Sequence, residues 1–240
     1  MKFKLISLFP EMLEDILSVS IIGRAVKDEK LEIEYIQLRD YSENKHKKVD
    51  DYPYGGGAGM VMQMQPIVDA LKTVSGRVIY LTPKGQVFNQ ALAKELALEE
   101  ELVFLCGHYE GIDQRIIDHY VTDEVSIGDF VLTGGELPAM VMMDAVARLK
   151  EGVLGQNISY EDESHYNGLL EYPHYTRPSN YEGMLVPDVL ISGNHKKIED
   201  YRLEESIKLT AERRPDMIEK YAEGKLSKNE IKILRKYIDK

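Results

Sequence analysis

Residues 107–113 read GHYEGID and residues 126–136 read SIGDFVLTGGE. Each of these glycine-rich turns directly follows a short apolar run that is typical of a β-strand. Because glycine lets a ligand approach the backbone closely, the turns can offer N–H and C=O groups to a flat polar molecule, for which a nucleobase is the natural candidate. Neither turn matches G-x-x-x-x-G-K-[ST] or G-x-G-x-x-G, which argues against a phosphate cradle of either kind.

Strand-like and helical segments alternate along the first 150 residues. Strands are expected at 3–9, 31–38, 77–81, 102–106 and 121–127, and helices after Pro10 and at 67–74, 90–98, 113–120 and 137–149. This order predicts an α/β domain with a mainly parallel sheet. In such sheets ligands bind beyond the carboxyl ends of the strands, where the loop 82–85 and both glycine-rich turns fall. We therefore expect the three loops to share one site.

The composition favours a cytoplasmic protein with a sizeable core. The 240 residues are 43% hydrophobic, and the single cysteine, Cys106, excludes an intrachain disulfide and is expected in the core. No apolar stretch is long enough to span a bilayer. The apolar run at the N-terminus ends at Pro10 without the cleavage site of a signal peptide.

Charge is distributed unevenly along the chain. The net charge of −11 argues on its own against a nucleic-acid partner, but residues 195–240 carry 13 Lys and Arg against 10 Asp and Glu. This asymmetry marks a separate C-terminal module. Its helices are expected at 198–212, 216–222 and 227–238, with Ser227 and Glu230 as a capping box. The residues before it, 152–196, are polar and aperiodic and resemble a long linker.

Several segments together resemble one known family. They are ISLFPEM at 6–12, GRAV at 23–26, HKKVDDYPYGGGAGM at 46–60, the two turns, GLLEYPHYTRP at 168–178, SGNH at 192–195 and RRP at 213–215. In order and spacing they are similar to the bacterial tRNA (guanine-N1) methyltransferases of the TrmD type, which belong to the knotted SPOUT class.

The resemblance implies a domain organisation and a methyl donor. It places a SPOUT methyltransferase domain with a trefoil knot at residues 1–160, a flexible interdomain linker at 161–183 and a helical tRNA-binding domain at 184–240. The knot is expected to hold S-adenosyl-L-methionine. By motif position, the contacts fall on Leu81, Thr82, Pro83, Gly85, Gly107, Tyr109, Glu110, Gly111, Ile127, Gly128, Leu132, Gly134, Gly135 and Pro138.

The resemblance also implies a reaction, methyl transfer to N1 of guanine 37 of tRNA, immediately 3′ of the anticodon. N1 carries a proton that must leave, so a base is needed near it. The family uses an aspartate fifteen residues after an arginine on the long helix. Counted from Arg148, that position holds Glu163, a departure from the family pattern, and the neighbouring Asp162 is the second candidate.

Three further side chains receive roles from the same resemblance. Arg148 is expected to stabilise the negative charge that develops on O6 of the guanine. Glu110 can accept hydrogen bonds from the N1/N2 edge of guanine, which adenine does not reproduce. Asp50 is expected to help order a glycine-rich lid over the methyl donor. The alternatives are a solvated loop carboxylate at 162 and 163, an ion pair on the helix surface for Arg148 and a carboxylate at a helix N-terminus for Glu110.

Partners follow from the resemblance as well. Contacts to the tRNA backbone are expected from Arg177, His195, Lys197, Arg202, Lys208, Arg213 and Arg214. In the family, two chains pair so that the knot of one and the linker and tail of the other build each site. This predicts an obligate homodimer with composite active sites.

Two other functions remain as alternatives. One is an RNA-binding module that keeps the knot without chemistry, against which Arg148, Glu110 and an acid at 163 argue. The other is a knotted methyltransferase that acts on ribosomal RNA or on a different tRNA base. The six histidines lack the spacing of metal ligands, so the residues predict no metal site, although the resemblance allows Mg²⁺ to assist the transfer.

Overall fold

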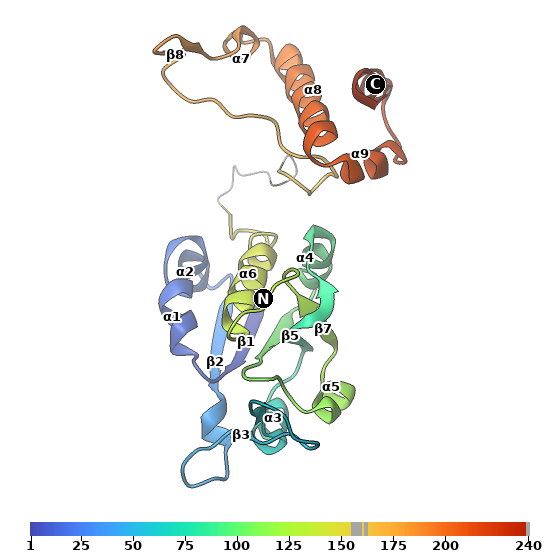
Figure 1. Cartoon of the computed structure of the whole chain (residues 1–240). Helices are drawn as coiled ribbons and strands as arrows, with labels where there is room; N and C mark the ends of the chain where they lie inside the picture. The colour runs from blue at the N-terminus through green and yellow to red at the C-terminus, as the bar shows by residue number, and fades with distance from the viewer. Residues whose placement is uncertain (155–159, 161–162, 239–240) are drawn as a thin grey trace. The chain divides into compact units, whose positions relative to one another are not determined.

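The computed structural model describes residues 1–154, 160 and 163–238. The chain forms two compact units, Met1–Ile158 and Ser159–Lys240 (Figure 1). Among the described residues, no helix has both the length and the apolar character that a membrane crossing requires.

The first unit is built around a five-stranded sheet (Figure 1). Its strands are β1 (Lys2–Ser7), β2 (Glu32–Gln37), β5 (Arg77–Val87), β6 (Glu101–Cys106) and β7 (Asp123–Ser126). They lie in the order β2-β1-β6-β5-β7, and every neighbouring pair is parallel. This confirms the predicted α/β class with a mainly parallel sheet.

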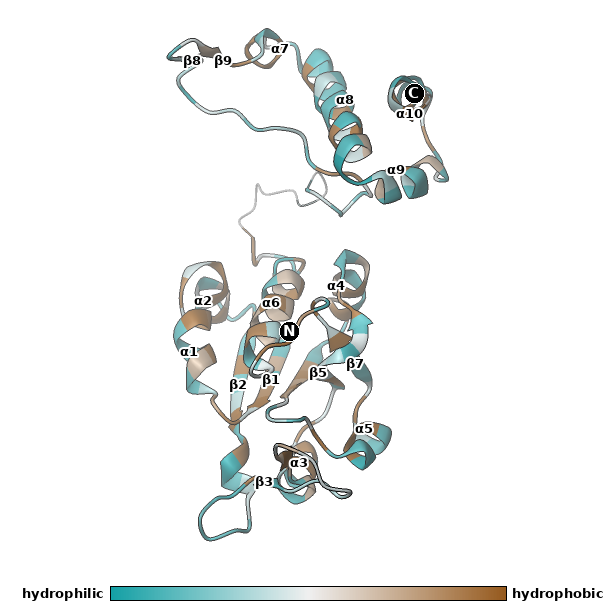
Figure 2. Ribbon diagram, viewed as in Figure 1, coloured by the Kyte–Doolittle hydropathy of each residue, from teal (hydrophilic) through white to brown (hydrophobic). Residues whose placement is uncertain are grey.

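Both faces of the sheet are buried. The helices of this unit are α1 (Glu11–Leu17), α2 (Ser20–Lys27), α3 (Met64–Leu71), α4 (Gln90–Leu96), α5 (Gln114–Tyr120) and α6 (Glu136–Ala147). Along β6, Leu102, Phe104 and Cys106 enter a core shared with α1, α2, α4 and α6. Val103 and Leu105 enter the opposite core, shared with α3 and α5. Side chains of a strand alternate between faces, so a strand covered on both sides reads as a continuous apolar run. In Figure 2 the apolar residues of β1 and β5 appear as brown stretches within these strands.

The loop 82–85 corrects one sequence prediction, because it lies inside a strand. The predicted strand ends at Leu81, whereas β5 continues to Val87. A register shift follows Leu81, after which Gln86 and Val87 pair with Val125 and Ser126 of β7. Residues 82–85 therefore leave the ladder locally, and the pairing resumes beyond them.

Several short elements were not predicted from the sequence. They are α2, the 3-10 helix Leu38–Tyr41, the hairpin of β3 (Asp50–Asp51) and β4 (Val61–Met62), the hairpin of β8 (Asn180–Tyr181) and β9 (Met184–Leu185), and α7 (Asp188–Ile191). A strand of two residues is too short to show alternation, so tertiary pairing alone defines it.

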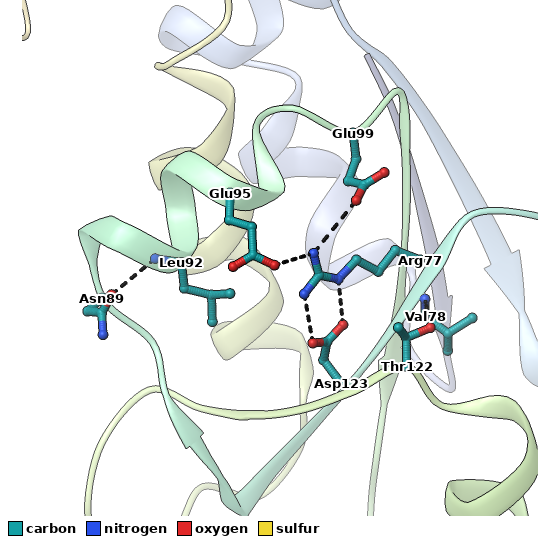
Figure 3. Close-up of polar contacts among 8 residues, drawn as sticks. All are labelled: Arg77, Val78, Asn89, Leu92, Glu95, Glu99, Thr122 and Asp123. Atoms are coloured by element: carbon teal, nitrogen blue, oxygen red, sulfur yellow. Dashed lines mark hydrogen bonds and ion pairs between the residues drawn. The ribbon is translucent and has the colours of Figure 1, made fainter.

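One ion-pair cluster ties β5, β7 and α4 together (Figure 3). The guanidinium of Arg77 donates from Nε and Nη2 to the two carboxylate oxygens of Asp123, at 2.6 and 2.8 Å. Its Nη1 lies 2.6 Å from Glu95 Oε1 and 3.6 Å from Glu99 Oε1. The hydrogen bonds to Asp123 are the main reason that the pKa of Arg77 is raised.

The second unit is a small helical bundle. Its main helices are α8 (His195–Arg213), α9 (Pro215–Ala222) and α10 (Lys228–Ile238). They surround a core of Leu169, Ile207, Ile218, Ile233 and Leu234. Leu169 lies within the segment predicted as linker, so part of that segment packs on the helices. The limits of the three predicted domains stay a prediction.

The predicted capping box at the start of α10 is confirmed. The backbone N–H of Ser227 donates to Glu230 Oε2 at 2.7 Å, and the backbone N–H of Glu230 donates to Ser227 Oγ at 3.2 Å. The two side chains satisfy donors that the first turn of a helix leaves unpaired.

Candidate active site

A cavity of about 280 Å³ lies at the carboxyl ends of β6 and β7 and beside residues 80–84 of β5, where the register of that strand shifts. The three loops expected to share a site all contribute to its wall, because parallel strands end at the same edge of the sheet. Thirteen of the fourteen residues predicted to hold the methyl donor line it: Leu81, Thr82, Pro83, Gly107, Tyr109, Glu110, Gly111, Ile127, Gly128, Leu132, Gly134, Gly135 and Pro138.

The fourteenth, Gly85, does not line this cavity. Its Cα instead lies against the backbone of β7, where a Cβ would fall 2.4 Å from the carbonyl carbon of Glu124 and from the nitrogen of Val125. The register shift in β5 turns this residue toward the neighbouring strand. The cavity lining therefore does not support the prediction that Gly85 contacts the methyl donor, whereas the other thirteen residues do line the cavity.

The two glycine-rich turns are bound to each other by backbone contacts. Gly135 N–H donates to Gly107 O at 3.0 Å, and His108 and Gly134 form an antiparallel bridge. A Cβ on Gly134 would lie 2.4 Å from Cε1 of His108. Glycine at 134 therefore allows the two turns to approach each other. From the sequence, this packing role could not be distinguished from a role in ligand contact.

Beside these turns lies a buried polar network that the sequence analysis missed. Glu136, at the start of α6, accepts from Ser7 Oγ at 2.5 Å through Oε1, and both of its oxygens lie 2.8–2.9 Å from His108 Nε2. Burial alone would raise the pKa of Glu136, but the hydrogen bonds from His108 and Ser7 reverse the shift, and the pKa is lowered. No local pattern could reveal the network, because its members are 28 and 129 residues apart.

The glycine-rich β3–β4 hairpin, which contains Asp50, lies against the turn that contains Glu110. Asp50 pairs with Met62 in the β3–β4 hairpin. Met62 N–H donates to Gly111 O, and Glu110 N–H donates to Met60 O, both at 3.0 Å. The structure thus brings the segment that carries Asp50 against the turn that carries Glu110.

Comparison with known proteins identifies the family. The family model described as tRNA (Guanine-1)-methyltransferase TrmD matches residues 1–220. The chain belongs to this family. The match confirms the resemblance drawn from the sequence motifs.

Three relatives of the TrmD family illustrate the similarity. The chain is 57% identical over 227 residues to a tRNA (guanine-N(1)-)-methyltransferase of Clostridioides difficile (strain 630), covering 92% of this chain and 98% of that protein. A protein of the same name from Clostridium botulinum (strain Loch Maree / Type A3) is 57% identical over 241 residues, 99% of this chain and 98% of its own. One from Clostridium perfringens (strain SM101 / Type A) is 58% identical over 239 residues, 98% and 99% respectively.

The residues predicted for proton transfer lie in different parts of the chain. Arg148 is the half-buried residue that ends α6, in the first unit. Glu163 belongs to the second unit, where its backbone N–H donates to Tyr160 O at 3.3 Å. Asp162 lies outside the described residues. The catalytic roles of all three stay predictions for this member of the TrmD family.

The residues predicted to contact tRNA all belong to the second unit: Arg177, His195, Lys197, Arg202, Lys208, Arg213 and Arg214. The guanidinium of Arg202 lies over the ring of Tyr172, with its carbon 4.8 Å from the ring centroid. Arg214 forms an ion pair with Asp216 at 2.6 Å, which offsets part of its charge. Arg213 is exposed at the last position of α8.

Metal binding receives no support from clustered ligands. Within residues 1–154, 160 and 163–238, no group of three His, Cys, Asp or Glu side chains is arranged to hold a metal ion. A Mg²⁺ ion that assists the methyl transfer stays a prediction from the TrmD resemblance.

Proposed function

We propose that this chain transfers a methyl group from S-adenosyl-L-methionine to N1 of guanine 37 of tRNA, giving N1-methylguanosine. The observation that carries the proposal is the TrmD match over residues 1–220, together with a cavity at the carboxyl ends of parallel strands. The relatives are named as tRNA (guanine-N(1)-)-methyltransferases and are similar over nearly their whole length.

The cavity fits the proposed donor. Apolar side chains, among them Leu81, Ile127 and Leu132, line it beside the backbone of the glycine-rich turns. An adenosyl group needs flat apolar contacts together with backbone donors and acceptors, and this wall offers both. S-adenosyl-L-methionine supplies an electrophilic methyl group on a sulfonium sulfur. The part of the chain that holds it is inferred to close into the trefoil knot of the SPOUT class.

The proton on N1 and the charge on O6 need protein groups. Glu163 is the proposed acceptor of the N1 proton, with Asp162 as the second candidate. Arg148 is proposed to stabilise the negative charge that develops on O6 as N1 loses its proton. These roles require the two units of the chain, or of two chains, to meet at the substrate.

Glu110 and Asp50 are proposed to act on the acceptor side of the cavity. Glu110 lines the cavity and is exposed, so its carboxylate is available to the N1/N2 edge of a guanine. Asp50 lies in the β3–β4 hairpin, whose backbone binds the turn of Glu110. We infer that this hairpin covers the bound donor.

An apolar surface supports the proposed homodimer. Met12 and Ile16 on α1 and Leu137 and Val141 on α6 are about half exposed, and these two helices pack on each other. Adjoining apolar side chains in solvent are typical of a protein interface. We infer a cytoplasmic homodimer in which each site combines the cavity of one chain with Glu163 of the other. The exposed basic residues of the second unit would contact the tRNA backbone.

The proposal is tested by methyl transfer from labelled S-adenosyl-L-methionine to tRNA transcripts. Guanine stands 3′ of the anticodon in one transcript and adenine in the other. We expect label only in the guanine transcript, at N1 by mass spectrometry of the digested RNA. Label at another base or in ribosomal RNA would support the related knotted methyltransferase. Binding of tRNA without label in any RNA would support a binding module.

A further inference from the structure

The network of Ser7, His108 and Glu136 takes no part in the proposed chemistry, yet it lies at the wall of the donor cavity. Its members come from the end of β1, the turn after β6 and the start of α6. The side chain of Glu136 is 3% exposed and that of His108 is 14% exposed. Such a deeply buried carboxylate must have its oxygens satisfied, and here Ser7 and His108 satisfy them.

We propose that Glu136 is a positioning residue of the methyl-donor site, acting through His108 to hold the turns 107–111 and 133–135 at their working separation. The inference rests on the proposed function in one respect, the identity of the donor. It adds a residue that contacts neither the donor nor the guanine.

The wall held by this network is thin. A second cavity, of about 300 Å³, lies beside α1 and α6. His108, Thr133 and Gly134 line both this cavity and the donor cavity. These three residues therefore form the partition between the two spaces. Apart from the backbone contacts between the two turns, its position depends on the side chains that border it.

The side chain of His108 determines the position of this partition. Its ring fills the space that the missing side chain of Gly134 leaves, and it meets the ring of Phe9 edge-on at 5.2 Å between centroids. Aromatic contacts leave rotation of the ring comparatively free, whereas the hydrogen bond from Nε2 to the carboxylate of Glu136 fixes its direction. If the ring turns away, Gly134 loses its contact and the turn can move.

The negative charge of Glu136 is also favoured at its position. Glu136 occupies the first turn of α6, a helix of twelve residues, where the backbone N–H groups favour a negative charge. A carboxylate held there accepts from Ser7 and from His108 at once. Removing it leaves the buried Ser7 hydroxyl and the mostly buried His108 ring without this partner, so the turns would repack rather than remain in place.

The test compares Glu136→Ala with Glu136→Gln, and uses Glu11→Ala as the matched control. Glu11 is likewise an acid in the first turn of a helix, but it is exposed. Glutamine can accept from Ser7 Oγ and donate its amide to His108 Nε2 in the other tautomer, so it preserves the geometry without the charge. Binding of S-adenosylhomocysteine is measured by calorimetry, and KM and kcat are measured with a guanine-37 transcript.

For Glu136→Ala we expect the Kd for S-adenosylhomocysteine and the KM for the donor to rise about tenfold, with kcat reduced less. The Kd of Glu136→Gln for S-adenosylhomocysteine is expected to lie within about threefold of the wild-type value. The Kd of Glu11→Ala is expected to equal the wild-type value. A merely structural role would lower the melting temperature and the active fraction, without changing the Kd of the folded molecules. Equal Kd values for wild type and Glu136→Ala overturn the proposal, as does failure of Glu136→Gln to restore binding.

If circular dichroism shows that Glu136→Ala is unfolded, Ser7→Ala replaces it. This variant removes one donor at almost constant volume and is expected to raise the Kd about threefold. An unchanged Kd then overturns the proposal. A wild-type protein that neither binds S-adenosylhomocysteine nor methylates the transcript would instead contradict the proposed function, which keeps the two failures distinct.

Discussion

Glu163 is the residue on which the proposed proton transfer depends. We expect Glu163→Gln to lower kcat about 100-fold or more, because an amide cannot take the N1 proton. The Kd for S-adenosylhomocysteine should stay at its wild-type value. Single-turnover methyl transfer with saturating tRNA measures the chemical step.

Asp162→Asn is the matched variant, one position away with the same chemical change. It should methylate at close to the wild-type rate. The reverse outcome, a slow Asp162→Asn and a normal Glu163→Gln, would assign the base to Asp162. Normal rates in both would remove the acidic pair from the mechanism.

Gly59 is predicted to position Glu110. Its φ is +104°, and a Cβ would lie 2.5 Å from Oε1 of Glu110. In Gly59→Ala the carboxylate must move, so kcat/KM for the guanine transcript should fall about tenfold while binding of the donor persists. Steady-state kinetics with both substrates varied would show this.

The same hairpin supplies the control for this prediction. Gly57 has a φ of +139°, and the nearest atom to its Cβ position is 3.9 Å away, on Pro53. Gly57→Ala therefore introduces backbone strain without a contact to Glu110. If Gly57→Ala impairs kcat/KM as much as Gly59→Ala does, the effect belongs to the mobility of the hairpin rather than to Glu110.

At the scale of elements, Arg77 should contribute to stability because it joins β5, β7 and α4. We expect Arg77→Ala to lower the free energy of unfolding by about 2 kcal/mol, since it leaves the mostly buried carboxylate of Asp123 without its partner. This is less than a fully buried pair would give, because Glu95 and Glu99 are about half exposed. Arg77→Lys should lower the free energy of unfolding by about half as much, because lysine cannot form the bidentate contact with Asp123.

Urea denaturation measures these differences. Lys72→Ala is the control, since Lys72 and Asp69 form an exposed ion pair at 3.0 Å that should contribute nothing measurable. An Arg77→Ala protein as stable as Lys72→Ala would mean that solvent replaces the whole cluster.

The junction of β1 and α6 should show a dependence of stability on pH. The pKa of Glu136 is lower in the folded protein than the value of about 4.3 expected for an unfolded chain. Its ionised form therefore stabilises the fold above that value, and this contribution is lost as the pH falls through the folded pKa. The difference in unfolding free energy between wild type and Glu136→Gln should be constant near neutral pH and should shrink below about pH 4. If the difference in unfolding free energy grew as the pH falls, the pKa of Glu136 would be raised by folding instead of lowered.

At the scale of the whole molecule, composite sites predict complementation between two inactive variants. Leu132→Trp should fill the donor cavity, and Glu163→Ala should remove the proposed base. In a mixed dimer, one site combines an intact cavity with an intact Glu163. Random mixing should therefore restore about one quarter of wild-type activity. Sites formed within a single chain would restore none, which makes the mixing assay decisive.

Local pattern determined the outline of the first unit and little of its interior geometry. The apolar runs predicted the strands of the parallel sheet because each is buried on both faces, and their order predicted a site at their carboxyl ends. Pattern failed at β3 and β4, which are two residues long, and at the continuation of β5 to Val87. Two residues are too few to show alternation in β3 and β4, which pair only with each other. The continuation of β5 is defined by its pairing with the distant strand β7, which a short stretch of sequence does not contain.

The sequence by itself determined the family, through motifs whose order and spacing span the chain, and with it the candidate residues of the site. Only the tertiary structure decided which glycines line the cavity, that Gly134 is needed to admit His108, and that Ser7 meets Glu136. The reason is physical. A motif records residues that are neighbours along the chain, whereas a hydrogen bond across 129 residues exists only once the sheet has brought β1 beside the start of α6.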